Sequence, residues 1–431
     1  MIDTSRAPGR QTEIYLAGAR GIRPRVPVNA EQLERAAEQA LSPAALAYLA
    51  GGAGAESTMR ANRTAFERWR IVPRVLRDVS GRDASIELFG SALPSPIVLS
   101  PVGVLELMHR DADRAVARAA ASLGVPMIFS NQASVPMEAC AREMAASPRW
   151  FQLYWSRDDE LVASLVRRAE GCGCSAIVVT LDTTFLGWRT RDLDLGHLPF
   201  MQGMGIAQYT SDPVFMRKLQ EPLPGPAPAR GPVTAAALRT AVSMARAVPG
   251  GLVANLRSGN AVAAVRRFVA TYSRPSLTWD DLPTLRTLTS LPIILKGVLH
   301  PDDARRAVDA GMNGVMVSNH GGRQVDGGIA ALDALPAVIE AVGGRVPVLM
   351  DSGIRTGADA FRALALGARA VGIGRPVAYG LALAGEAGAR EVIANMMAEL
   401  ELTMALAGCA SVSAIGRDSV LRLDATPGAD A

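Results

Sequence analysis

The chain alternates short, continuous apolar runs with longer amphipathic segments. Apolar runs without polar interruptions are typical of strands that a parallel sheet buries on both faces. Seven of the runs precede a segment with helical character: Arg110–Leu123, Pro136–Ala145, Asp158–Glu170, Asp302–Ala310, Leu332–Val342, Gly357–Gly367 and Arg390–Ala407. The eight runs themselves are Pro96–Gly103, Pro126–Asn131, Trp150–Trp155, Ala176–Asp182, Pro292–Gly297, Gly314–Asn319, Pro347–Ser352 and Ala370–Arg375. Eight strands that alternate with helices predict an α/β fold, a (β/α)₈ barrel.

Two regions lie outside this alternation. Residues 1–90 precede the first strand and are expected to form a helical cap, and residues 91–415 to form the barrel. Residues 201–277 separate the fourth and fifth strands and are far longer than an ordinary βα connection. They include the proline-rich stretch Glu221–Pro232, and we expect an inserted lid there, partly mobile. Residues 416–431 are expected to form a C-terminal tail.

Composition narrows the class of protein. Of the 431 residues 49% are hydrophobic and 20% charged, which fits a globular protein. The 45 basic and 41 acidic side chains give a net charge of only +4, which is too well balanced to indicate nucleic-acid binding. No stretch has the roughly 18 apolar residues that a membrane span requires, and Met1–Tyr15 has no apolar core of a signal peptide. Cys172 and Cys174 do not have the spacing of a zinc or redox pair. We expect a cytoplasmic protein with reduced thiols and no metal site.

Polar residues and glycines collect where the predicted strands end. Barrel enzymes place their sites at these carboxyl ends, so the pattern predicts where a site lies. In chain order the ends carry Pro101, Val102, Gly103, Ser130, Asn131, Gln152, Tyr154, Thr180, Asp182, Arg189, Lys296, Ser318, Asn319, His320, Gly321, Gly322, Arg323, Asp351, Ser352, Gly353, Arg355, Gly374 and Arg375.

Two of these ends predict a bound cofactor. The last two strands offer glycine amides with Arg355 and Arg375, the position at which barrels most often bind phosphate. The alternative is that both arginines pair with surface carboxylates. Lys296 ends an otherwise apolar strand, and a buried lysine requires an anionic partner. An electron-rich cofactor ring is one such partner; a Schiff base and a buried salt bridge are the alternatives.

The sixth strand end predicts acid–base chemistry. His320 is followed by two glycines, which suggests open space and access for a general base. Arg323 could bind a carboxylate through two parallel hydrogen bonds, and Asp182 could orient the imidazole. The alternative is a histidine packed in a loop.

Ser318–Gly327, SNHGGRQVDG, resembles the signature of the FMN-dependent L-2-hydroxy acid oxidising family. The resemblance covers about residues 30 to 415. It includes, in the expected order, Tyr48–Glu56, Asn62–Arg77, Phe151–Tyr154, Asp351–Asp359 and Ala365–Pro376. The family includes glycolate and lactate oxidases, lactate 2-monooxygenase and mandelate dehydrogenase.

The resemblance implies a role for each candidate residue. His320 would take a proton from the substrate and Asp182 would stabilise its charged form, while Tyr154 would bind the substrate oxygen. Arg323 and Arg189 would bind the substrate carboxylate with help from Tyr48. FMN would contact the remaining residues, with its phosphate at Gly353, Arg355, Gly374 and Arg375, its ring at Ser130, Gln152, Thr180 and Lys296, and further contacts at Pro101, Val102, Gly103, Ser318, Asp351 and Ser352.

Within the family, Thr180–Phe200 and Gly205–Phe215 look most like lactate 2-monooxygenase, and Gly103 fits that subgroup. Gln132, Trp155 and the pair Val325 and Asp326 depart from it. The expected activity is oxidation of a small L-2-hydroxy acid by O₂, with coupled decarboxylation as an extension. Three alternatives stay open: a dehydrogenase with another electron acceptor, an FMN barrel of the isomerase type, and a flavin-binding module without catalysis. The family also suggests a homotetramer.

Overall fold

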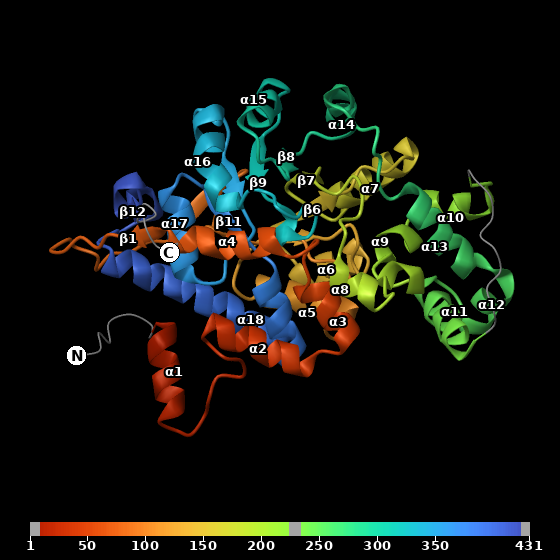
Figure 1. Cartoon of the computed structure of the whole chain (residues 1–431), viewed down its shortest axis with the longest axis horizontal. Coiled ribbons are helices and arrows are strands. Elements are labelled where there is room, and N and C mark those ends of the chain that lie inside the picture. Colours follow the sequence, from red (N-terminus) through yellow and green to blue (C-terminus); the bar gives the residue numbers. More distant parts are fainter. Residues whose placement is uncertain (1–8, 224–233, 424–431) are drawn as a thin grey trace, which may run out of the picture.

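Eight parallel strands close into a barrel in the computed structural model, which describes residues 9–223 and 234–423 (Figure 1). Each of the eight apolar runs overlaps one barrel strand, so the predicted barrel is confirmed. The last strand of the barrel pairs with the first, Val371 beside Ile97, and this pairing closes the sheet. The strands are β4 (Ile97–Leu99), β5 (Met127–Phe129), β6 (Arg149–Leu153), β7 (Ile177–Thr180), β8 (Ile293–Lys296), β9 (Gly314–Val317), β10 (Val348–Met350) and β11 (Ala370–Ile373).

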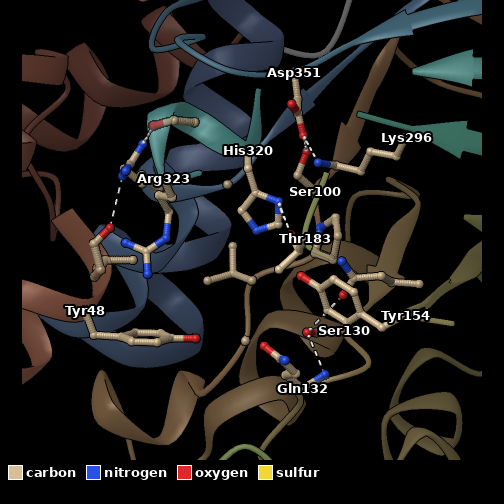
Figure 2. Close-up of a pocket in the computed structure, with 18 of the residues that line it drawn as sticks. Tyr48, Ser100, Ser130, Gln132, Tyr154, Thr183, Lys296, His320, Arg323 and Asp351 are labelled. Atoms are coloured by element: carbon tan, nitrogen blue, oxygen red, sulfur yellow. Dashed lines mark hydrogen bonds and ion pairs between the residues drawn. The ribbon is translucent and has the colours of Figure 1, made fainter. Parts of the chain in front are cut away.

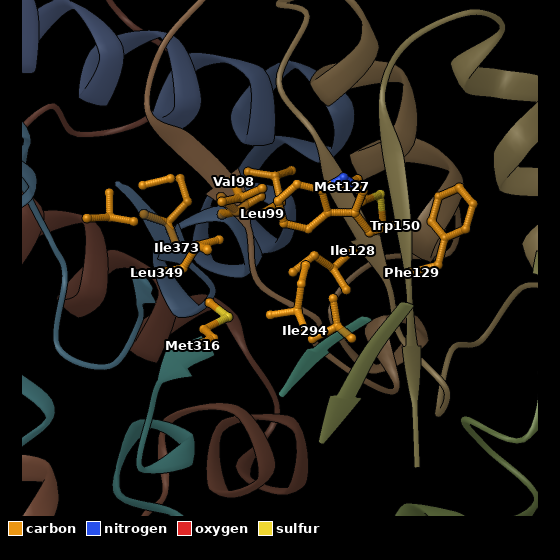
Figure 3. Packing of buried hydrophobic residues seen from close by; sticks show 14 of the residues in the cluster. Val98, Leu99, Met127, Ile128, Phe129, Trp150, Ile294, Met316, Leu349 and Ile373 are labelled. Atoms are coloured by element: carbon orange, nitrogen blue, oxygen red, sulfur yellow. The ribbon is translucent and has the colours of Figure 1, made fainter. Parts of the chain in front are cut away.

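The barrel strands carry almost only buried apolar side chains, which explains their uninterrupted hydrophobic pattern. Figure 3 shows this packing at Val98, Met127, Ile128, Ile294 and Leu349. The outer face of the sheet is buried because helices pack around the barrel. These are α5 (Ala112–Ala121), α6 (Met137–Met144), α7 (Asp159–Gly171), α14 (Leu282–Leu288), α15 (Pro301–Asp309), α16 (Ala331–Val342), α17 (Gly357–Ala365) and α18 (Arg375–Leu406).

The last helix differs from its prediction. It was expected at Arg390–Ala407, but α18 begins at Arg375, directly after the eighth barrel strand. Its backbone leaves helical geometry at Ala384 and Gly385, where it kinks. Glycines allow the close approach at this kink, because a Cβ on Gly380 would lie 2.5 Å from the carbonyl oxygen of Gly388. The same glycines interrupt the helical pattern of the sequence. The early start places the first turn of α18 at the strand end where the sequence predicts a bound phosphate.

The N-terminal segment contains strands as well as the predicted helices. The helices are α1 (Arg10–Gly18), α2 (Ala30–Ala40), α3 (Pro43–Ala50) and α4 (Ser57–Glu67). Strand β1 (Trp69–Ile71) pairs antiparallel with β12 (Val420–Arg422), so the described part of the predicted tail is fixed to this segment. Strands β2 (Ile86–Leu88) and β3 (Ser91–Leu93) form a hairpin. Three-residue strands carry too few positions for an alternating pattern to show, which is why the sequence did not predict them.

The insertion between β7 and β8 is largely helical. It contains α9 (Ala207–Thr210), α10 (Pro213–Arg217), α11 (Ala235–Ala247), α12 (Leu252–Ser258) and α13 (Asn260–Thr271), preceded by the short α8 (Thr190–Asp194). In Figure 1, α11 to α13 form a group beside the barrel. The proline-rich stretch from residue 224 onward lies outside the described residues.

The hairpin β2–β3 covers the end of the barrel that faces away from the strand carboxyl ends. Phe89 lies at its turn, and its ring packs edge-on against Trp150 with the ring centroids 5.4 Å apart. A Cβ on Gly314 would lie 3.0 Å from the Phe89 ring. Trp150 and Gly314 lie at the beginning of their strands, so Phe89 fills the amino-terminal mouth of the barrel.

We predict that Phe89→Ala lowers the free energy of unfolding and leaves catalysis intact. The ring is half-buried, so we expect a loss of about 2 kcal/mol, less than the roughly 3–5 kcal/mol for removing a fully buried aromatic side chain. Glu87→Ala, an exposed change in the same hairpin, is the matched control and should change stability little. Chemical denaturation and steady-state rates measure both effects. A fall in kcat without a fall in stability would contradict the assignment of this end of the barrel to stability.

Candidate active site

The carboxyl ends of the barrel strands surround a cavity of about 320 Å³. Three candidate residues lie just behind its wall, each bonded to a residue that lines it. Thr180 accepts a hydrogen bond from Gln152 at 3.0 Å, Asp182 contacts His320, and Ser318 accepts one from Lys296 at 2.8 Å. The other candidates all line the cavity: Tyr48, Pro101, Val102, Gly103, Ser130, Gln152, Tyr154, Arg189, Lys296, His320, Arg323, Asp351, Ser352, Gly353, Arg355, Gly374 and Arg375. The structure therefore brings the complete predicted set together.

His320 is held by a carboxylate on one side of its ring. Its Nδ1 lies 2.8 Å from Asp182 Oδ1 and 3.3 Å from the Thr183 hydroxyl, which leaves Nε2 as the nitrogen available to a ligand. Burial lowers the pKa of His320 below 6.5, and the negative charge of Asp182 partly opposes this effect. Burial alone would raise the pKa of Asp182, but the positive charges of His320 and Lys296 lower it to about 2. The pair therefore consists of an ionised carboxylate beside an imidazole that is neutral near pH 7.

The two glycines after His320 have a different role from the one predicted. They do not create open space, because their neighbours are in close contact: a Cβ on Gly321 would lie 2.7 Å from Arg375 and one on Gly322 2.7 Å from the Met59 amide. His320, Gly321 and Gly322 all have positive φ, between 58° and 77°. Glycine is required here by a left-handed turn packed against α4. His320 reaches a ligand through the cavity instead.

Three guanidinium groups at the cavity indicate that its ligand is anionic. Arg323 donates to the Gly51 carbonyl at 2.8 Å, and Arg375 donates to the carbonyls of Gly51, Leu49 and Gly321 at 2.8 to 3.0 Å. Arg189 contacts the Arg323 carbonyl and the Gln324 amide oxygen. Burial lowers the pKa of Arg323 to about 9 and that of Arg375 to about 10. Carbonyl dipoles satisfy these donors without neutralising their charge, so bound anions would be stabilised here.

Lys296 combines two of the alternatives that the sequence left open. Its ammonium group forms a buried ion pair with Asp351 at 3.2 Å and also lines the cavity. Burial lowers its pKa, but the negative charges of Asp351 and Asp182 outweigh this effect and raise it. The lysine is therefore a charged group that remains available to a ligand ring. Figure 2 shows His320 between Arg323 on one side and Lys296, Thr183 and Tyr154 on the other.

One wall of the cavity was not predicted as part of the site. It is apolar and comes from the β7 loop and the insertion: Leu186, Leu198, Phe200, Phe268, Val269 and Tyr272. Phe268 stacks on Tyr272 with centroids 5.3 Å apart, and Phe200 lies edge-on to Tyr48 at 6.4 Å. They come from loops, a short 3₁₀ helix and the end of α13, which the strand pattern does not order in space. The spacing of residues 268, 269 and 272, which share one face at the end of α13, was the available signal.

Two polar contacts that the sequence did not reveal fix the loop that carries His320 and Arg323. Asn62 on α4 and Asn319 exchange side-chain hydrogen bonds of 2.7 and 2.8 Å. Asp326 accepts hydrogen bonds from the amides of Ala55 and Ser57, at the start of α4. Asp326, which departs from the subgroup pattern, therefore caps the N-terminus of a helix from a distant loop. Both contacts attach the loop that carries His320 and Arg323 to the N-terminal cap.

The FMN-dependent dehydrogenase family model matches residues 37–422. The chain belongs to this family. It is 42% identical over 414 residues to the FMN-dependent alpha-hydroxy acid dehydrogenase qulF of Penicillium citrinum, covering 96% of this chain and 95% of that protein. It is 39% identical to the L-lactate oxidase of Lysinibacillus sphaericus, covering 92% and 94%. A crystal structure of mandelate oxidase superposes with a TM-score of 0.73 at 37% identity, covering 90% of this chain and 97% of that one.

FMN is thus the cofactor of this flavoprotein, and the residues present fit it. The donor set suits an anionic phosphate at one end of the cavity, where the hydrogen-bond partners of Arg375 among the described residues are three main-chain carbonyls. Ser130, Gln152 and Lys296 supply neutral and cationic donors further along the cavity. Close packing explains the glycine at the eighth strand, because a Cβ on Gly372 would lie 2.3 Å from the Ser100 hydroxyl.

In the described residues, no helix could span a membrane and no group of His, Cys, Asp and Glu could hold a metal.

We predict that the His320 imidazole titrates below pH 6.5 and that Asp182→Asn moves this titration lower still. The substitution removes the negative charge that stabilises the imidazolium, while burial continues to favour the neutral ring. The chain has only four histidines, so NMR of histidine-labelled, FMN-bound protein resolves them, and His320→Gln identifies the signal. A His320 titration above pH 6.5, or one that rises in Asp182→Asn, would show that the pair is organised differently.

Proposed function

We propose that the protein oxidises an L-2-hydroxy acid with an apolar substituent to the 2-oxo acid and uses O₂ as the electron acceptor. The observation that carries this proposal is the position of the His320–Asp182 pair, between the residues suited to FMN and two arginines, Arg189 and Arg323, that form no ion pair within residues 9–223 and 234–423. A base beside an anion site is the arrangement that oxidation of a hydroxy acid requires. The two most similar relatives described above act, by their names, on an alpha-hydroxy acid and on L-lactate.

The substrate carboxylate would be bound by Arg323 and Arg189. Both side chains line the cavity, and the planar guanidinium group matches a carboxylate in geometry. The Arg323 guanidinium lies 5.0 Å above the Tyr48 ring, which limits its movement and places the Tyr48 hydroxyl in the same region. Burial raises the pKa of Tyr48 and of Tyr154, so both hydroxyls stay protonated and can donate hydrogen bonds to substrate oxygens. Four donors would thus fix the orientation of the hydroxy acid.

His320 would take the proton. Its neutral Nε2 can accept a proton from the bound substrate, and Asp182 would stabilise the imidazolium that forms, 2.8 Å away. Oxidation to the 2-oxo acid removes two electrons and two protons from the substrate. FMN, when bound, supplies the acceptor for the two electrons. Lys296 places a positive charge at the cavity wall, where it would favour the negative charge that accompanies reduction.

The apolar wall indicates the class of substituent. Phe200, Phe268, Val269 and Tyr272 offer surface for an aliphatic or aromatic group and no charged partner for a second carboxylate. Hydroxy acids such as lactate, its longer homologues and mandelate fit this description. A dicarboxylic hydroxy acid would leave its second carboxylate without a partner and should be a poor substrate.

A coupled decarboxylation of the product is the second candidate. The insertion favours it, because Phe200 and Phe268 enclose the cavity that would hold the 2-oxo acid. Gly103 also lines this cavity, but its glycine reflects close packing rather than open space, since a Cβ there would lie 3.0 to 3.2 Å from Gln132 and from the Tyr48 hydroxyl. If the 2-oxo acid stays there, the hydrogen peroxide formed from O₂ can decarboxylate it to a shortened acid, CO₂ and water.

Anaerobic mixing with a series of 2-hydroxy acids tests the proposal. We expect the yellow FMN-bound protein to bleach with L-lactate, L-2-hydroxyisocaproate or L-mandelate, and L-malate to bleach it slowly, because its second carboxylate meets the apolar wall. Stopped-flow absorbance at the flavin band gives the rates. Failure of every 2-hydroxy acid to reduce the flavin would overturn the proposed function.

Product analysis in air separates the remaining activities. An oxidase yields the 2-oxo acid and hydrogen peroxide, and a monooxygenase yields the shortened acid and CO₂. In a dehydrogenase, the reduced flavin is reoxidised slowly in air and rapidly by an artificial electron acceptor. If the activity is instead of the isomerase type, Arg323→Met and Arg189→Met retain it, because no substrate carboxylate then needs these two arginines.

A further inference from the structure

A second, smaller cavity lies behind the wall of the candidate active site. It has a volume of about 20 Å³ and sits between the first and last barrel strands, β5 and the helices α5 and α18. We call it the rear cavity. It is lined by Leu99, Ser100, Val102, Leu105, Val116, Met127, Ile128, Ile373, Gly374, Val377 and Ala378. Ser100, Val102 and Gly374 also line the large cavity, so one layer of residues separates the two.

The rear cavity has room for one small molecule but offers little to water. A water needs about 10–15 Å³ of such space and two to four polar partners. The lining side chains are apolar except Ser100, whose hydroxyl already donates to Asp351 at 3.0 Å. The lining amides of Leu99, Ser100 and Val377 donate to main-chain carbonyls at 2.8 to 3.0 Å. A site of this kind stays dry and accepts an apolar guest.

The position of the rear cavity gives it a functional meaning. The strand end Pro101–Gly103 forms the wall of the active site, and Val102 on that strand end faces both cavities. A Cβ on Gly374 would lie 3.4 Å from Val102 Cγ2, so the Val102 side chain fills the boundary beside a residue without a side chain of its own. An apolar molecule in the rear cavity would be one side chain away from the large cavity.

We propose that the rear cavity binds dioxygen and supplies it to the active site. Dioxygen is small, uncharged and apolar, and it is the acceptor in the proposed function, on which this inference rests. In the oxidase reaction one O₂ takes up the two electrons and two protons that one 2-hydroxy acid loses, and the 2-oxo acid and H₂O₂ leave. The rear cavity places this reactant beside the site without occupying the space that the substrate needs.

Xenon binding tests the cavity without any turnover. Xenon is a probe for dry apolar cavities, and crystals of the FMN-bound protein under xenon pressure should show one atom within the rear cavity. Ala378→Val on α18 adds two carbon atoms to the lining and should remove this atom. Val116→Ala enlarges the same cavity from α5 and should raise the occupancy. An absence of xenon from the wild-type cavity and from Val116→Ala would overturn the proposal.

The two half-reactions test the role of O₂. In Ala378→Val, flavin reduction by the hydroxy acid should stay within about twofold, while kcat/KM for O₂ falls by about tenfold, because a positioned reactant is lost. Ala382→Val, one turn along α18, half-buried and outside the lining, is the matched control and should change neither value. The proposal is overturned if Ala378→Val no longer binds xenon but keeps the wild-type kcat/KM for O₂. It is also overturned if flavin reduction and kcat/KM for O₂ fall by the same factor.

The experiment separates this inference from the proposed function. Flavin reduction by a hydroxy acid together with slow wild-type reaction with O₂ would overturn the role of the rear cavity and leave hydroxy acid oxidation intact. Failure of flavin reduction by every hydroxy acid would overturn the proposed function, and with it the role of the rear cavity in oxidase turnover.

Discussion

The structure depends on the burial of positive charge at one end of a barrel. Lys296 is buried and Arg323 and Arg375 are half-buried, yet among the described residues only Lys296 of the three forms an ion pair with a carboxylate. Burying a charge without a partner is costly, and the protein meets part of that cost with carbonyl dipoles rather than carboxylates. The Gly51 carbonyl, at the C-terminal end of α3, accepts hydrogen bonds from both Arg323 and Arg375. A helix C-terminus carries partial negative charge, so it holds the cations while leaving them able to bind anions.

This arrangement links the N-terminal cap to the chemistry. The same short helix, α3, provides Tyr48 to the cavity, the Leu49 carbonyl to Arg375 and the Gly51 carbonyl to both arginines. Helix α4 holds the loop after β9 in two ways: the Asn62 side chain bonds to Asn319, and the main-chain amide of Ser57 donates a hydrogen bond to Asp326. The cap therefore does more than cover the barrel: it positions the residues proposed to bind the substrate carboxylate and the cofactor phosphate. Most of these contacts come from main-chain groups, whose geometry is fixed by the helices, and Tyr48 and Asn62 add their side chains.

The barrel and the identity of the polar residues in the site could be predicted from sequence, for a physical reason. Strands buried on both faces read as unbroken apolar runs, and the residues after them must meet at one end of a closed barrel. The family resemblance added the cofactor. The partners of these residues could not be predicted, because Gly51, Asn62 and Leu49 act through main-chain carbonyls or through contacts more than 250 residues apart in the chain. The apolar wall was missed because the insertion returns to the site through α13, and local pattern does not specify that return.

The most direct test of the account is the affinity of the FMN-bound protein for oxalate, a dianion that resembles the substrate and lacks a hydrogen to give up. Oxalate should perturb the flavin absorbance in a saturable way in the wild-type protein. In the double variant Arg189→Met and Arg323→Met the affinity should fall by about 100-fold or more, since each charged hydrogen-bond partner contributes about 1.5–3 kcal/mol. FMN should remain bound, because Arg375 is unchanged. Unaltered oxalate affinity in the double variant would contradict the central claim that these buried arginines bind the substrate carboxylate.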